Sequence, residues 1–146
     1  MTVAGQNAIF APLFAMLFLT LGVWVYMYAL RIPFIYRNRL TAVQMTPLEF
    51  ARMSPAAISN PSDNLKNLFE IPVLFYVMSL YLFATQQVDA IYLAASWVFV
   101  VFRYLHSAVH CTVNIVLLRF GLYVVSALSL WFVVLRAAFR FYELGF

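Results

Sequence analysis

The chain has 146 residues, of which 66% are hydrophobic and only 10% are charged, and its formal net charge is +4. A chain of this length corresponds to one domain, 1–146. Its polar residues are too few to cover a water-soluble globule, which indicates an integral membrane protein in contact with lipid. Basic residues in such a chain orient it in the bilayer, so the positive charge does not indicate a nucleic-acid partner.

Four apolar stretches are long enough to cross a bilayer as helices. We predict an all-α, multi-pass antiparallel bundle with spans at approximately 9–35, 61–86, 90–111 and 118–142. No small-residue cleavage site follows the first stretch, so we expect it to remain as a transmembrane helix. Its far end is marked by Arg31 and Pro33.

The segment between the first two spans, 36–66, is the long polar loop of the sequence. Thr46 to Glu49 has the spacing of a capping box with proline at the first helical position, which predicts a short surface helix over 47–53. Asn60 to Asp63 repeats the order of N-cap, proline and early acid, so the second span should begin there. Pro72 predicts a mild kink within that span.

The second and third spans are joined by a short turn that makes them antiparallel neighbours, and Asp89 is the expected N-cap of the third. Seven Lys and Arg residues fall at one end of the bundle, and only Arg136 and Arg140 at the other. The positive-inside rule then places loop 36–66 in the cytoplasm and both termini on the opposite side, across the cytoplasmic membrane in a bacterium. Arg136 and Arg140 are interpreted as plain orientation signals.

Charge reappears at the end of a long apolar run in the third span. The thirteen residues from Ala90 to Phe102 carry no charge, so Arg103 lies roughly 20 Å along the helix and inside a hydrocarbon core of about 30 Å. An arginine there costs on the order of 3 kcal/mol and normally faces a partner, a ligand or trapped water. His106 and His110 share its helix face. Arg103 is therefore a candidate functional residue.

Antiparallel alternation brings the start of the second span, the end of the third and the start of the fourth to one membrane face. The residues expected to meet there are Lys66, Asn67, Glu70, Arg103, His106, His110 and Arg119. Asn67 and Glu70 are three residues apart on one helix face, and Glu70 is at the depth needed to pair with Arg103. One carboxylate among several cations leaves a positive site, which suits an anionic ligand.

These residues resemble a known family. The stretches Lys66 to Pro72 and Arg103 to His106, together with Arg119, are similar in spacing to the prostaglandin E synthase branch of the membrane-associated proteins in eicosanoid and glutathione metabolism, MAPEG. Arg31 also has a counterpart there. The resemblance covers most of the chain, and implies a four-helix protomer, a homotrimer and a glutathione site between protomers near the cytoplasmic face.

The resemblance also implies residue roles. In that family an arginine early in the fourth span holds the glutathione thiol as thiolate, and this role falls to Arg119. The candidate residues for binding the rest of glutathione are Arg31, Lys66, Asn67, Glu70, Arg103, His106 and His110. His110 stands where better-known members carry a tyrosine, and Ile115 where several carry a further arginine, so the substrate pocket could differ from that of the eicosanoid enzymes.

Simpler interpretations of the same residues remain open. Glu70 and Arg103 could form a purely structural ion pair, and His106 and His110 could bind a metal together with Glu70, although no metal is predicted. Cys111 is interpreted as a packed thiol, because it lies at the C-terminal end of a helix, where the helix dipole disfavours a thiolate.

The sequence is compatible with three functions. The leading hypothesis is a glutathione-dependent transferase or peroxidase acting on a lipophilic small molecule that enters from the bilayer. The alternatives are a non-catalytic lipid-binding or scaffold protein of the same fold, and a small transporter. Four spans without an internal repeat are few for a transporter.

Overall fold

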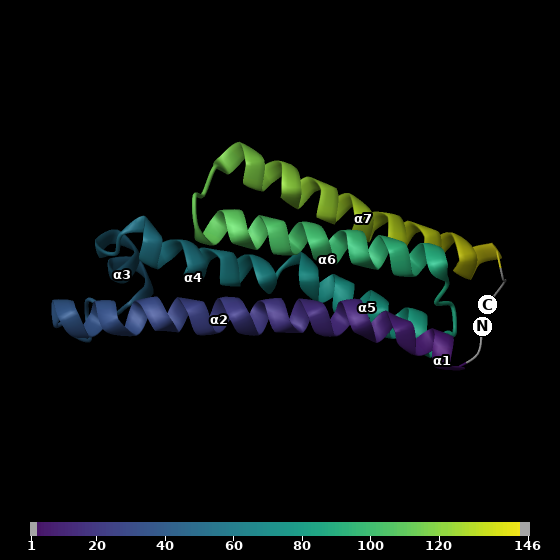
Figure 1. Ribbon diagram of the computed structural model, residues 1–146, viewed down its shortest axis with the longest axis horizontal. Coiled ribbons are helices and arrows are strands. Elements are labelled where there is room, and N and C mark those ends of the chain that lie inside the picture. Colours follow the sequence, from purple (N-terminus) through teal and green to yellow (C-terminus); the bar gives the residue numbers. More distant parts are fainter. Residues whose placement is uncertain (1–2, 144–146) are drawn as a thin grey trace.

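The computed structural model describes residues 3–143, and this part of the chain contains helices and no strands. Four long helical segments lie side by side in an antiparallel bundle (Figure 1). Each is long and apolar enough to cross a membrane, and they cover Asn7–Asn38, Ala56–Ala84, Ala90–Cys111 and Val116–Glu143. The start of α1 and the end of α7 lie at one end of the bundle and α3 at the other (Figure 1). The predicted four-helix membrane fold is confirmed.

The first span consists of the short 3-10 helix η1 (Asn7–Ile9) and α2 (Phe10–Asn38), and α1 (Val3–Gln6) precedes it. Gln6 fastens this end to the turn between the second and third spans. Its side-chain oxygen accepts from the Val88 N–H at 2.9 Å, and its amide nitrogen donates to the Val88 carbonyl at 3.2 Å. At the far end Arg39 adopts the left-handed conformation (φ 49°), and Leu40 N–H donates to the Ile35 carbonyl, which caps the helix.

The predicted surface helix is present as α3 (Pro47–Met53), but the predicted capping box is wrong. The Thr46 side chain makes no cap bond to the helix; its hydroxyl donates to the Val43 carbonyl at 2.8 Å instead. Pro47 at the first helical position favours the start of the helix, because its φ is preset for a helix and it lacks an N–H that would have no partner there.

The second span consists of two helices, α4 (Ala56–Leu68) and α5 (Ile71–Ala84), separated at Phe69 and Glu70. It starts before the predicted Asn60 N-cap, and Pro61 lies inside α4. The expected mild kink at Pro72 is a complete break. The ring of Pro72 would clash with the carbonyl four residues earlier, and that residue, Leu68, is the last of α4.

The third and fourth spans, α6 (Ala90–Cys111) and α7 (Val116–Glu143), form the most extensive helix pair, and α2 packs against α4 and α6. The predicted N-cap is confirmed, because the Asp89 carboxylate accepts from the Tyr92 N–H at 2.9 Å. The second and third spans contact each other where the Phe75 ring of α5 stacks on the Phe99 ring of α6, with the ring centroids 4.6 Å apart. This contact lies in the central apolar cluster of the bundle.

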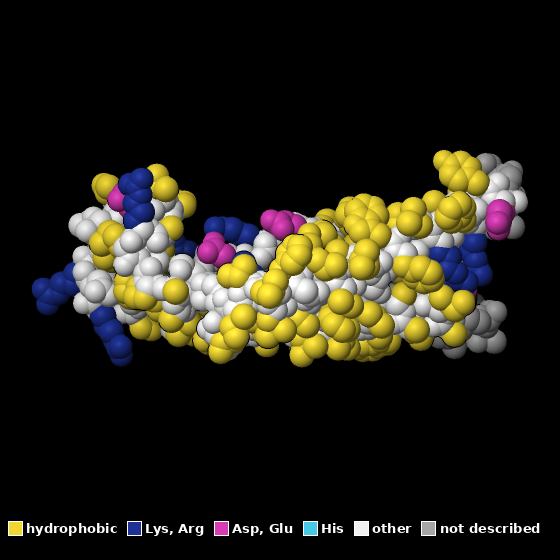
Figure 2. All heavy atoms as spheres, turned by 90° about the horizontal axis from the view of Figure 1, so that it is seen from above, with side chains coloured by type: hydrophobic (Ala, Val, Ile, Leu, Met, Phe, Trp, Pro, Cys, Tyr) yellow, Lys and Arg dark blue, Asp and Glu magenta, His cyan; other side chains and the backbone are white. Residues whose placement is uncertain are grey.

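Most of the surface of the four spans faces outward. Only 22% to 39% of the most apolar stretch of each span is buried inside the chain. Hydrophobic side chains cover much of the elongated body, Lys and Arg side chains lie mainly toward its two ends, and acidic side chains lie also between the left end and the middle (Figure 2). This distribution is the one expected for a protein surrounded by lipid.

Candidate functional site

The end of α4, the end of α6 and the start of α7 bring several predicted site residues together. Asn67 from α4, His106 from α6 and Arg119 from α7 line one hollow of about 270 Å³. Tyr123, one helical turn beyond Arg119, completes the polar part of the wall, and the remainder is apolar. Three helices that are distant in sequence therefore contribute polar groups to one small space.

Arg103 lies close behind this hollow and is fully buried, with 0% of its surface exposed. Its guanidinium carbon is 5.0 Å from the centroid of the Tyr123 ring and 5.4 Å from that of Phe99. None of its three side-chain nitrogens has a hydrogen-bond partner among the described residues. A buried charge without a partner is costly, and Arg103 has more unsatisfied side-chain nitrogens than any other described residue of the site.

The two histidines have different partners. His106 Nδ1 lies 3.0 Å from the Arg119 carbonyl oxygen, and since a carbonyl only accepts, this nitrogen must carry the proton. His106 Nε2 is buried without a partner among the described residues. His110 Nδ1 lies 3.5 Å from the Asn67 amide nitrogen, and the two histidine rings are perpendicular, 5.6 Å apart. Both rings are thus held by neighbouring helices.

The Arg119 guanidinium is fixed by a neutral amide. Its Nη1 donates to Asn114 Oδ1 at 2.8 Å, and the Asn114 amide nitrogen donates to Asn60 Oδ1 at 3.1 Å. Among residues 3–143, no carboxylate forms an ion pair with Arg103 or Arg119. The charge of both guanidinium groups is therefore not compensated by the described part of the chain.

Residues 9–139 match the MAPEG family. The chain belongs to the MAPEG family. No individual curated protein and no solved structure matches it. Membership associates this MAPEG protein with membrane-associated glutathione and eicosanoid metabolism, and the four-helix membrane fold agrees with that assignment.

Besides Arg103 and His110, which lie beside the hollow, three predicted site residues lie away from it. Arg31 and Lys66 border a separate space of about 240 Å³ between α2, α3 and α4. Within it, the Arg31 guanidinium lies 4.2 Å from the centroid of the Phe50 ring, and Lys66 is paired with Asp63 at 2.8 Å. The third, Glu70, is exposed at the break between α4 and α5.

The expected ion pair between Glu70 and Arg103 is absent from the described residues. The break between α4 and α5 is the reason. Glu70 has non-helical dihedral angles (φ −98°, ψ −109°), so its side chain no longer follows the α4 face that carries Asn67, and it is exposed. The structural ion pair proposed as an alternative is not formed either.

Sequence reasoning identified Asn67 but missed that it belongs to a row of amides on α4. Asn60, Asn64 and Asn67 follow a helical spacing on α4, and this regularity was the available signal. Asn64 is fully buried, accepts from the Ser107 hydroxyl at 3.3 Å and donates to the Cys111 sulfur at 3.4 Å. Cys111 is therefore a packed, hydrogen-bonded thiol. In the described part of the chain, no three metal-binding side chains converge.

The opposite end of this MAPEG protein carries a second charged cluster. Arg136 binds both oxygens of the Asp89 carboxylate, at 2.9 and 2.7 Å, and Arg140 lies 3.2 Å from Oδ2. Burial alone would raise the pKa of Asp89, but the hydrogen bonds from Arg136 and the Tyr92 N–H and the two positive charges lower it below its usual value. Arg136 and Arg140 thus have a structural role in addition to any effect on orientation.

Proposed function

We propose that this MAPEG protein is a membrane-embedded, glutathione-dependent transferase or peroxidase that acts on a lipophilic substrate arriving from the bilayer. One observation carries the proposal. The Arg119 guanidinium, without a carboxylate partner in residues 3–143, lines a hollow together with Asn67 and His106. A positive, partly apolar hollow at a helix junction suits an anionic thiol.

The donor set of the hollow fits glutathione, which is a peptide with two carboxylates and one thiol. Asn67 and Arg119 offer N–H donors, and His106 Nε2 offers an acceptor without a partner for an N–H of the ligand. Arg103 would bind a carboxylate, and this requires the Tyr123 ring to move from its place against the guanidinium. The ligand would thereby satisfy buried groups that the described chain leaves unsatisfied.

Bound glutathione would supply the nucleophilic sulfur. A free thiol with a pKa of about 8.5 is only a few per cent ionised at neutral pH. Arg119 would stabilise the thiolate, with the proton released to water. Lowering the thiol pKa by two units requires about 2.7 kcal/mol of differential stabilisation, which one guanidinium in a partly dry site can supply.

Assembly and orientation are part of the proposal. We expect a homotrimer with the α3 end in the cytoplasm, where a neighbouring copy would cover the exposed break at Phe69 and Glu70. Arg31 and Lys66, which lie in a separate space on this chain, would reach glutathione only as part of such an assembly. The carboxylate of Glu70 would then be available to the ligand's amine.

Ultraviolet absorbance of the glutathione thiolate, titrated against pH with the full chain in detergent, tests the proposal. We expect the wild-type protein to lower the thiol pKa by about two units and Arg119→Ala to return it to about 8.5. Arg37→Ala is the matched control, because Arg37 is exposed at the end of α2. S-methylglutathione, which has no thiol, gives the background.

Two results would overturn this function: an unshifted thiol at saturating glutathione in the wild-type protein, or a shift that persists in Arg119→Ala. Arg119→Lys separates charge from geometry. A lysine keeps the charge but loses the planar fork of donors, so we expect a partial shift of the thiol pKa.

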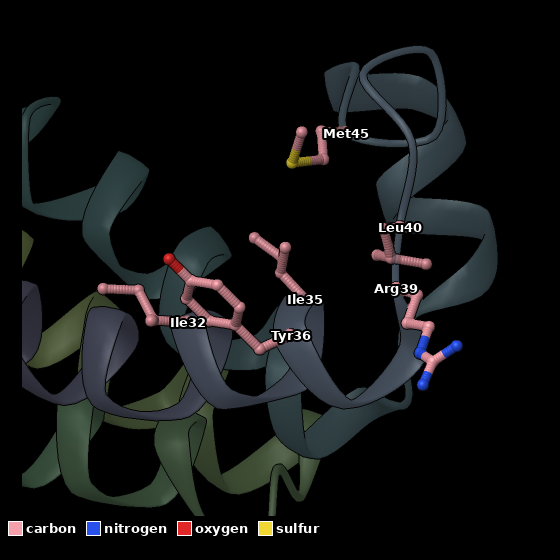
Figure 3. Close-up of a pocket in the computed structure, with 6 residues that line it drawn as sticks. All are labelled: Ile32, Ile35, Tyr36, Arg39, Leu40 and Met45. Carbon is pink, nitrogen blue, oxygen red and sulfur yellow. The ribbon is translucent and has the colours of Figure 1, made fainter.

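A second candidate function, non-catalytic lipid binding, is favoured by another hollow. A space of about 570 Å³ lies between the last turns of α2 and the loop that follows, lined by Ile32, Ile35, Tyr36, Arg39, Leu40 and Met45. Figure 3 shows Ile35 and Tyr36 on α2 with Met45 across from them on the loop, while the Arg39 guanidinium points away. Its apolar wall suits an acyl chain. Lipid retained on purification together with no turnover of any glutathione acceptor would favour this function.

A further inference from the structure

We infer that Asn114 is a positioning residue that holds the Arg119 guanidinium toward the hollow and, being neutral, leaves its positive charge intact for an anionic ligand. The inference rests on the proposed function and adds to it the residue that positions Arg119, the group proposed to stabilise the thiolate. It follows from the hydrogen-bonded series that runs from Asn60 through Asn114 to Arg119.

Asn114 is held in place by its backbone. It lies in the short connection between α6 and α7, in the left-handed conformation with φ 46°. Its N–H donates to the Val109 carbonyl at 2.8 Å, which ends α6. Asparagine tolerates this conformation better than most residues with a side chain, so its presence here is consistent with the backbone requirement. The side chain therefore projects from a fixed point next to α7.

The direction of the Asn114 amide is set by its other partner. Asn60, which is 8% exposed on α4, presents Oδ1 to the Asn114 amide nitrogen at 3.1 Å. With its nitrogen directed at α4, Asn114 must direct Oδ1 at Arg119, and the 2.8 Å contact shows this geometry. The backbone of Arg119 is fixed independently, because His106 Nδ1 donates to its carbonyl at 3.0 Å.

A carboxylate in place of the amide would change the chemistry. The groups that face Arg119 around the hollow are Asn67 from α4, His106 from α6 and Tyr123 from α7, and none of these is an acid. Asparagine and aspartate have nearly the same shape, but aspartate at 114 would form an ion pair with Arg119 and cancel its charge. The thiolate would then lose its counter-charge with little change in geometry.

The test compares the pKa of bound glutathione thiol in four variants of the full chain in detergent. We expect Asn114→Asp to raise it by about one unit or more through the added negative charge. Asn114→Gly keeps the left-handed backbone and removes the side chain, so a smaller rise is expected, with kcat lowered about tenfold and KM little changed. Asn60→Ala should act in the same direction but more weakly. Asn38→Asp, an exposed asparagine at the end of α2, is the control and should leave the thiol pKa unchanged.

Thermal melting by circular dichroism establishes that each variant is folded. If the wild-type protein shifts the thiol pKa and both Asn114 variants, folded, shift it equally, the inference is overturned and the proposed function stands. If the wild-type protein leaves the thiol unshifted, both are overturned. A role of Asn114 in folding alone would lower the melting temperature without moving the thiol pKa, and that outcome also overturns the inference.

Discussion

Arg103 gives the sharpest prediction, because ligand binding and ligand-free stability should respond to it in opposite directions. Its guanidinium is 0% exposed and its nitrogens have no partner in residues 3–143. Burying such a charge costs several kcal/mol. The contacts with the rings of Phe99 and Tyr123, at 5.4 and 5.0 Å, each return roughly 1 to 2 kcal/mol when desolvated. The balance is a net cost in the absence of ligand.

Replacing Arg103 by methionine removes the charge and keeps a long side chain that packs well against aromatic rings. We therefore expect Arg103→Met to raise the ligand-free free energy of unfolding by about 1 to 2 kcal/mol. Glutathione at one hundred times its dissociation constant should stabilise the wild-type protein by about 2.7 kcal/mol. The variant should lose most of this stabilisation, because the carboxylate partner is gone.

Unfolding in mild detergent, driven by a denaturing detergent and followed by helicity, measures both quantities with and without glutathione. Arg37→Met is the control, since Arg37 is exposed and should change neither quantity by more than a few tenths of a kcal/mol. A loss of several kcal/mol in ligand-free Arg103→Met would refute the reasoning, because it would mean that the guanidinium is already satisfied within the folded protein.

Two further predictions concern stability. Asp89→Asn keeps an N-cap but leaves Arg136 and Arg140 without their anion. The Arg136 and Asp89 side chains are 20% and 29% exposed, so the pair is intermediate between a surface and a buried ion pair. We expect the free energy of unfolding to fall by about 2 kcal/mol in the same assay. Since the folded pKa of Asp89 is lowered, this stabilisation is complete above its unfolded pKa of about 3.9 and is lost as pH falls further; the acid-induced loss should shrink in the variant. Gln6→Ala removes two buried hydrogen bonds to Val88 and should cost about 2 kcal/mol, whereas Gln44→Ala, whose bonds stay within its own loop, should cost much less; equal losses in the two glutamine variants would contradict this assignment.

The extent of the third span and the face that it buries were predictable from the sequence. Its charge-free run, its N-cap at Asp89 and the shared face of Arg103, His106 and His110 depend only on helical periodicity and on hydrophobicity. The structure agrees, since these three side chains are exposed by no more than 3%. In a regular helix, the spacing of residues along the sequence fixes which side chains share a face, which is why this part of the candidate site could be predicted.

Irregular backbone is where prediction from the sequence was wrong. The predicted pairing of Glu70 with Arg103 assumed one continuous helix. The helix is instead interrupted at Phe69 and Glu70, just before Pro72, and the non-helical backbone of Glu70 changes the direction of its carboxylate. The role of Asn114 depends on a left-handed residue in a connection whose path helical periodicity does not describe. The Asp89 cluster, in contrast, was within reach, because antiparallel alternation places the Asp89 turn beside the end of α7.

The surroundings of Arg103 would allow a membrane helix to carry an arginine whose donors stay available to a ligand, as the proposed function requires. An acidic partner would satisfy the guanidinium but would also neutralise it and occupy its donors. Aromatic faces behave differently: the rings of Phe99 and Tyr123 attract the charge through their quadrupoles, yet leave every N–H unused. The rings therefore offset part of the cost of burial, and in the proposed function the binding of an anion would relieve the remaining cost. On this reasoning, ligand affinity derives partly from the unsatisfied state of the free protein, and exchanging Tyr123 for an acid would stabilise the fold while weakening the binding of any anion.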